Sequence, residues 1–207
     1  PKPDEPTPEL PDQVLPWGID RIDAEHKWTH TTGSGAIIAI IDTGIDKDHP
    51  DLLVGRGINF VRRGRRVNRN AWDDDNGHGT HCAGIAAARD NDIGVVGVAP
   101  GATLYAVKVL NSSGSGYISD IIAGLQWAVD NDVDIVNMSL SADVDVEAFH
   151  DACDSAANSM LLVAAAGNDG SAVDYPAAYD SVIAVAATNS SDACPSWSNF
   201  GPEIDIA

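Results

Sequence analysis

The sequence predicts an α/β domain built around a mostly parallel sheet. The first observation is a regular alternation, in which short apolar runs of strand length and amphipathic segments of helix length follow one another. The second is the run Ala36–Ile41, which is apolar at every position, as in a parallel strand buried on both faces. The third is size, because 207 residues with 44% hydrophobic side chains suffice for one domain with a substantial core.

The N-terminal part leads into the first strand of this sheet. Residues 1–12 are rich in proline and acid, which predicts an extended tail or linker ahead of a domain at residues 13–207. A short helix is expected at residues 19–30. The strand at residues 36–41 follows it and ends at Asp42, where a turn is expected.

A polar stretch separates this strand from the next expected helix. Residues 55–76 predict an irregular loop, and five arginines lie between Arg62 and Arg69. This cluster fits a solvated surface loop or, alternatively, a site of processing or self-cleavage. Small residues and alanines follow His78, so a helix is expected to begin at or just after this histidine.

The second half of the chain alternates regularly between strands and helices. Strands are expected at residues 103–110, 133–138, 160–166 and 181–187, and helices at residues 118–129 and 146–157. Apolar residues recur on one side of each helix, namely Ile118, Ile121, Ile122, Leu125 and Val129 in the first, and Phe149, Ala152, Cys153 and Ala156 in the second. Strands joined through helices predict right-handed crossovers and parallel pairing.

Composition restricts the classes of function. The net charge is −19, from 31 acidic and 12 basic residues, which argues against nucleic acid as a partner. The acidic surface fits plain solvation, a high-salt habitat or several calcium sites. No apolar run reaches the roughly 20 residues of a membrane span. The three cysteines lack metal-ligand spacing, and a Cys153–Cys194 disulfide is possible in a secreted protein.

Polar side chains follow three of the expected strands. Asp42, Ser139 and Asn168 lie at or just beyond the carboxyl ends of their strands, where sites form in open parallel sheets. His78 begins a helix expected to pack on the same sheet. The sequence therefore predicts that these four residues meet at one edge.

The residue types indicate a hydrolytic site. A buried Asp42 beside His78 would fix the tautomer of the imidazole and stabilise its protonated form. The amide of Asn168 suits an oxyanion. An extended peptide could pair with a strand edge in a groove whose walls are Ser139, Leu140 and Ser141 on one side and Gly114, Ser115 and Gly116 on the other.

Three sequence blocks resemble the subtilisin-like serine proteases. They are Ile40-Ile41-Asp42-Thr43-Gly44-Ile45, His78-Gly79-Thr80-His81-Cys82-Ala83-Gly84 and Ala164-Ala165-Ala166-Gly167-Asn168. The resemblance covers residues 13–207 and implies a three-layer fold, a serine endopeptidase, and catalytic roles for Asp42, His78 and Asn168. It also implies that the nucleophilic serine lies in a segment beyond Ala207, so that the 207 residues alone would be inactive. The alternative is a non-catalytic peptide-binding module, or an inactive fragment, with a protease fold.

The same resemblance implies further properties. A structural calcium ion would be bound by Gln13, Asp51 and Asn91 through side chains and by Arg89, Ile93 and Val95 through carbonyls. Cys82 matches a thiol-containing branch of the family, which implies sensitivity to mercurials, whereas for any regulatory role the simpler alternative is a small buried residue that only packs. Where the family commonly has Gly-Gly, this chain has Ser141 and Ala142, which could narrow the primary pocket. A secreted monomer that acts on proteins or peptides is expected, with an N-terminal pro-segment as a candidate inhibitor.

Overall fold

A six-stranded parallel sheet forms the centre of the molecule. The computed structural model describes residues 11–207, so most of the tail predicted at residues 1–12 lies outside the described residues. The strand order is β2-β5-β1-β6-β7-β8, and every neighbouring pair is parallel. The strands are β1 (Ile37–Asp42), β2 (Val54–Asn59), β5 (Thr103–Lys108), β6 (Ile135–Met138), β7 (Leu161–Ala165) and β8 (Ile183–Val185). The predicted α/β class is confirmed.

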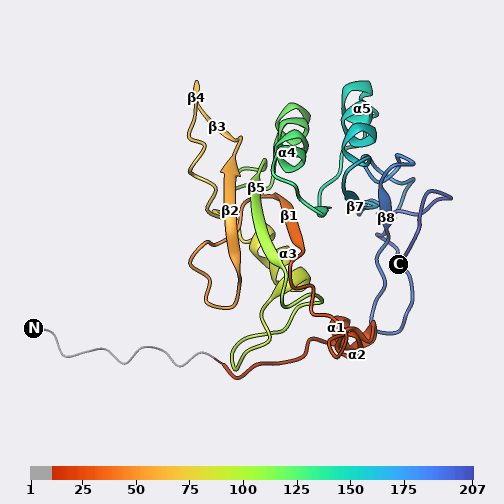
Figure 1. Cartoon of the computed structure of the whole chain (residues 1–207). Helices are drawn as coiled ribbons and strands as arrows, with labels where there is room; N and C mark the ends of the chain where they lie inside the picture. The colour runs from red at the N-terminus through yellow and green to blue at the C-terminus, as the bar shows by residue number, and fades with distance from the viewer. Residues whose placement is uncertain (1–10) are drawn as a thin grey trace, which may run out of the picture.

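Helices cover both faces of this sheet and produce the expected three layers (Figure 1). On one face lie α4 (Ile118–Asp130) and α5 (Glu147–Ala156), which pack Leu125 and Phe149 into the larger core. On the other face α3 (His78–Ala87) packs Ala83 and Ala87 against β1 and β5. The inward sides predicted for α4 and α5 are confirmed, since their members are buried or packed against the core.

The register of the central strands aligns the ends that carry the candidate site. Ile40 pairs with Asn137, and Asn137 pairs with Val163. Counting two residues further along each strand places Asp42, Ser139 and Ala165 at the same level. Because all these strands are parallel, the polar residues that follow them gather along one edge of the sheet.

Two expected elements differ from the structure. The single helix at residues 19–30 is wrong, because the chain forms α1 (Trp17–Arg21) and α2 (Ala24–Lys27), separated by Asp23 in a left-handed conformation (φ 55°). The irregular loop at residues 55–76 is also wrong in its first part. Residues 54–59 form the edge strand β2, and β3 (Arg62–Arg63) pairs with β4 (Arg66–Val67) as an antiparallel hairpin. Glycines at 55 and 57 hide the strand pattern of β2.

The Cys153–Cys194 disulfide is not present. Cys153 is fully buried on the inward side of α5, whereas Cys194 is exposed in the loop after β8, and both are free thiols. In the apolar core, Cys153 packs as a small hydrophobic residue and needs no covalent partner. Among residues 11–207, no helix is both long and apolar enough to cross a membrane.

Candidate active site

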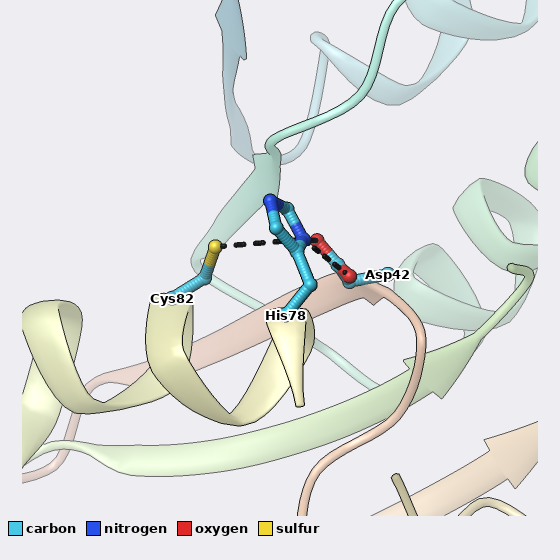
Figure 2. A group of neighbouring side chains, drawn as sticks. All are labelled: Asp42, His78 and Cys82. Carbon is cyan, nitrogen blue, oxygen red and sulfur yellow. Dashed lines mark hydrogen bonds and ion pairs between the residues drawn. The ribbon is translucent and has the colours of Figure 1, made fainter. Parts of the chain in front are cut away.

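Asp42 and His78 form a hydrogen-bonded pair at the carboxyl edge of the sheet. Both carboxylate oxygens of Asp42 lie 2.8 Å from Nδ1 of His78. The Asp42 side chain is completely buried, whereas 47% of the His78 side chain is exposed. Since an ionised carboxylate only accepts hydrogen bonds, Nδ1 carries the proton and Nε2 keeps the lone pair. Figure 2 shows the two side chains reaching each other from the end of β1 and the start of α3.

Local sequence explains how the helix comes so close to the strand. A Cβ on Gly79 would overlap the carbonyl oxygen of Gly44, so only glycine permits this approach. The Gly79 N–H donates to Oγ1 of Thr43 at 2.9 Å, and the Thr43 N–H donates to Oδ1 of Asp42 at 2.6 Å. Thr43 therefore links the residue after His78 to the carboxylate that holds His78.

Asp74 organises the turn that precedes the helix. Its Oδ1 accepts from the N–H groups of Asn76 and Gly77 at 3.0 and 2.9 Å and from the Thr43 hydroxyl at 2.8 Å. Its Oδ2 accepts from the N–H and hydroxyl of Thr80 at 3.0 and 2.6 Å. Burial alone would raise the pKa of Asp74, but these hydrogen bonds outweigh it and lower the pKa to about 2.

The role of Asp74 escaped the sequence analysis. The signal was present, since the acidic run before His78 contains residues that commonly accept hydrogen bonds from backbone N–H groups two residues on. Lys108 was missed as well. It is buried on β5 and donates to the Thr43 carbonyl, to the Leu110 carbonyl at 3.1 Å and to Asp75 at 2.6 Å. The loop after β1 is thus fixed from two sides.

A cleft of about 440 Å³ opens beside His78. It is lined by every residue predicted for the peptide groove, namely Gly114, Ser115, Gly116, Ser139, Leu140 and Ser141, together with Asn76, Leu110, Ile118, Ile121 and Ala142. The Ser141 hydroxyl donates to Asp174 at 2.8 Å, and Ala142 exchanges two backbone hydrogen bonds with Tyr175. The two residues that replace the usual glycines are therefore tied to the segment beyond β7.

Asn168 lies in the loop after β7, at the same edge of the sheet, and is exposed. The loop is held by Asn199, which is fully buried. Asn199 accepts from the N–H groups of Asp169 and Ser171 at 2.8 and 3.1 Å and donates to the Ala166 carbonyl at 3.1 Å. This clamp, which the sequence analysis missed, fixes the backbone on both sides of Asn168.

The thiol of Cys82 lies on the protonated side of the imidazole. Its Sγ is 3.9 Å from Nδ1 of His78, and Cys82 lies one helical turn beyond that residue. Figure 2 marks this contact with a dashed line. Burial raises the pKa of this thiol; a hydrogen bond with Ser139 lowers it in part, and the charges of Asp42 and Asp74 raise it, so that the pKa lies above its ordinary value. A neutral thiol that faces the proton-bearing nitrogen is not activated as a nucleophile.

The loop after α3 brings together the residues predicted to bind calcium. The Gln13 amide donates to the carbonyls of Arg89 and Val95 at 2.8 and 3.5 Å. The carboxylate of Asp51 is buried and accepts from the Asn91 amide at 2.9 Å and from the Val95 N–H at 3.0 Å. Ile93 lies in the same loop and donates its N–H to Oδ1 of Asn91 at 2.8 Å.

The fold and site define a parallel α/β protein whose Asp–His pair and cleft lie at the carboxyl edge of its sheet. The chain matches the model of the subtilase family over residues 33–207. It is 48% identical to subtilisin NAT of Bacillus subtilis subsp. natto over 202 residues, which cover 94% of the chain and 52% of that relative. A subtilisin of Bacillus pumilus is 46% identical over 202 residues, covering 94% of the chain and 72% of that relative.

A third relative, the minor extracellular protease Epr of Bacillus subtilis, is 42% identical over 200 residues, which cover 95% of the chain and 30% of that relative. The chain therefore belongs to the subtilase family. It spans about half the length of the subtilisin NAT sequence that it matches.

Proposed function

We propose that the protein is a serine endopeptidase that hydrolyses peptide bonds in protein or peptide substrates. The observation that carries the proposal is the pair of 2.8 Å contacts between Asp42 and Nδ1 of His78, at the mouth of the 440 Å³ cleft. With Nδ1 protonated, Nε2 is the nitrogen available to take a proton from a nucleophile. Membership of the family and the relatives named as proteases support the same reaction.

In this mechanism each residue has one task. An extended peptide lies between the segments 114–116 and 139–141 and presents its carbonyl beside His78. His78 takes the proton of the attacking hydroxyl at Nε2 and later returns it to the leaving amine. Asp42 stabilises the imidazolium, and the Asn168 amide donates to the oxyanion.

The nucleophile is proposed to be a serine of a segment that follows Ala207 in the full-length polypeptide. Within residues 11–207, the side chain of His78 has hydrogen-bond partners only in Asp42 and Cys82, and both face Nδ1. Cys82 is unsuited to attack for the reasons given above. A serine hydroxyl from elsewhere in the polypeptide would complete the set at Nε2.

Labelling with a serine-directed fluorophosphonate tests this proposal. The full-length protein should be labelled, and Asp42→Ala and His78→Ala variants should lose the label while retaining their circular dichroism spectra. Peptide mapping should place the adduct on a serine in a Gly-Thr-Ser context. A correctly folded protein that remains unlabelled and still binds peptides would instead be a non-catalytic peptide-binding module.

We further propose that the Arg89–Val95 loop binds a structural calcium ion. The Asp51 carboxylate is buried, and no basic side chain forms an ion pair with it within the described residues. The donor set consists of oxygens, as calcium prefers, and a half-turn of the Gln13 amide would place its oxygen beside the carbonyl oxygens of Arg89 and Val95, where all three could face one ion. The proposed ligands are the side chains of Gln13, Asp51 and Asn91 and the carbonyls of Arg89, Ile93 and Val95. The calcium ion would neutralise the negative charge of the buried Asp51 carboxylate.

We propose finally that the protein is secreted as a monomer, with an N-terminal pro-segment as its inhibitor. A relative named as an extracellular protease supports export. To test this proposal, the protein would be looked for in the culture medium of the source cells, where it should be found. Its N-terminus, its mass in solution and its inhibition by any segment encoded upstream would each be measured there.

A further inference from the structure

The hairpin β3–β4 concentrates positive charge on an acidic protein. Residues 62–69 contain five of the 12 lysines and arginines of a chain whose net charge is −19. Arg62 pairs with Val67 across the hairpin, and Gly64 and Arg65 form its turn. Figure 1 shows the hairpin beyond the end of β2 and beside α4.

A second hollow lies between this hairpin and the start of α4. It has a volume of about 340 Å³, and its lining includes Arg62, Asn111, Tyr117 and Asp120. Ser115 and Gly116 line this hollow as well as the cleft beside His78. The two spaces therefore share a wall, and a peptide that lies along residues 114–116 in the cleft can extend into the hollow.

One of the arginines of the hairpin lies at the hollow and has a guanidinium without a bonding partner in the described part of the chain. Arg69 lies over the Phe60 ring, with its guanidinium carbon 4.3 Å from the ring centroid, and contacts the Asn59 carbonyl. The Arg62 side chain is exposed, and its guanidinium forms no ion pair or hydrogen bond among residues 11–207, whereas its backbone pairs with Val67 in the hairpin. A guanidinium with free N–H groups at the rim of a hollow suits a carboxylate, which it can bind through two parallel hydrogen bonds.

The negative charge of Asp120 lies close to the positive charge of Arg62. It is 8% exposed at the start of α4 and also lines the hollow. Burial raises the pKa of Asp120, while the nearby charges of Arg62 and Arg69 lower it. The carboxylate of Asp120 therefore competes with an incoming acid for the positive potential of the two arginines, although no ion pair joins Asp120 to Arg62 among the described residues.

We propose that this hollow is a specificity subsite for an acidic side chain of the substrate, whose carboxylate is bound by Arg62. This inference rests on the proposed endopeptidase function, since it assigns a preference to the same groove. The subsite selects an acidic residue remote from the scissile bond, because the hollow lies beyond the part of the groove that contains His78. The otherwise acidic surface repels such peptides, so the hairpin is where they are attracted.

The experiment measures kcat/KM of the full-length protein on matched pairs of quenched fluorescent peptides. In each pair Glu is exchanged for Gln at one position, and the position is moved along the peptide on both sides of the cleaved bond. At one remote position Glu should be preferred by about two- to fivefold, the range for a solvent-screened ion pair. The preference should shrink in about 0.5 M salt.

Three variants separate a local contact from the general charge of the hairpin. Arg62→Ala should abolish the Glu preference, whereas Arg65→Ala removes the same charge from the exposed turn and should leave it nearly unchanged. Asp120→Asn should strengthen the preference by removing the competing carboxylate. Melting temperatures of the variants establish that they fold.

The outcomes distinguish the two proposals. If every peptide is cleaved without a Glu preference, or if Arg62→Ala leaves that preference intact, the subsite is refuted and the endopeptidase stands. If Arg65→Ala abolishes the preference as fully as Arg62→Ala, the effect is one of overall charge and the assignment of Arg62 is overturned. If no peptide is cleaved by the folded protein, the proposed function fails and the subsite falls with it.

Discussion

Replacing Asp74 by Asn should weaken the turn that positions His78. Five hydrogen bonds converge on the two oxygens of Asp74. An Asn side chain keeps the shape but turns one acceptor into a donor, which then faces N–H or O–H groups. The variant should therefore lose stability even though no volume is removed.

The magnitude follows from the pKa of Asp74, which is lowered from 3.8 to about 2. In full, this lowering is equivalent to ~2.4 kcal/mol. Asp74 is only partly buried, so solvent screening reduces the contribution to about 1 to 1.5 kcal/mol. In a domain of this size that amounts to about 3 to 5 °C in melting temperature.

The sign of the pH dependence gives the decisive assay. A carboxyl group whose pKa is lowered by folding stabilises the protein above its unfolded pKa, and this contribution disappears as the pH falls from 3.8 towards 2. Melting curves of the full-length protein and of Asp74→Asn should therefore differ at pH 6 by about the amount above and converge near pH 2. Both should carry His78→Ala, so that self-digestion does not distort the curves.

Asp73→Asn is the matched control for this measurement. Asp73 is the neighbouring residue, but its side chain is 54% exposed and pairs with Lys47 at the surface. The control should change the melting temperature little at any pH. A difference for Asp74→Asn that stays constant down to pH 2, or that Asp73→Asn reproduces, would refute the role assigned to the Asp74 carboxylate.

Three further changes have defined outcomes. Chelation of calcium should lower the melting temperature, and free calcium at about 100 times its dissociation constant should restore ~2.7 kcal/mol; an Asp51→Asn variant should lose this response, and a wild-type melt indifferent to calcium would exclude the site. Asp42→Asn should reduce kcat by about 10⁴-fold without unfolding the protein, the loss known for the equivalent change in one well-studied serine protease; retained activity would reject the Asp–His pair as catalytic. In the native protein, Ellman's reagent should modify the exposed Cys194 first and Cys153 only after unfolding, because burial raises the pKa of the Cys153 thiol to about 12; mass spectra showing a disulfide would contradict the structure.

The residues that the sequence made predictable are those placed by strand topology. Asp42, Ser139 and Asn168 each follow an apolar run, and parallel pairing brings the ends of such runs to one edge. The groove residues were predictable for the same reason, since the segments 114–116 and 139–141 follow β5 and β6. The alternation of strands and helices places these residues, and that alternation is visible in this one sequence.

The residues that escaped prediction act through contacts between loops. Asp74 and Asn199 accept hydrogen bonds from backbone N–H groups in turns. The conformation of such turns is not specified by the periodic pattern of apolar residues in the sequence. The edge strand β2 was not predicted, because glycine is rare in strands. Gly57 is required there by packing, since a side chain at this position would overlap the Trp72 ring. The Cys153–Cys194 pairing failed because the inward side of α5, which the sequence did indicate, already accounts for Cys153.

These two groups of residues have different effects on the proposed chemistry. The topology brings Asp42 and His78 within reach, but a reach of a few ångströms still permits many orientations of the imidazole. Thr43, Asp74 and Gly79 reduce that freedom by fixing the start of α3 against the end of β1. A displacement of a catalytic group by about 1 Å can lower the rate by about 100-fold. Substitutions in this supporting set should therefore lower kcat more than they raise KM, which distinguishes them from changes in the groove.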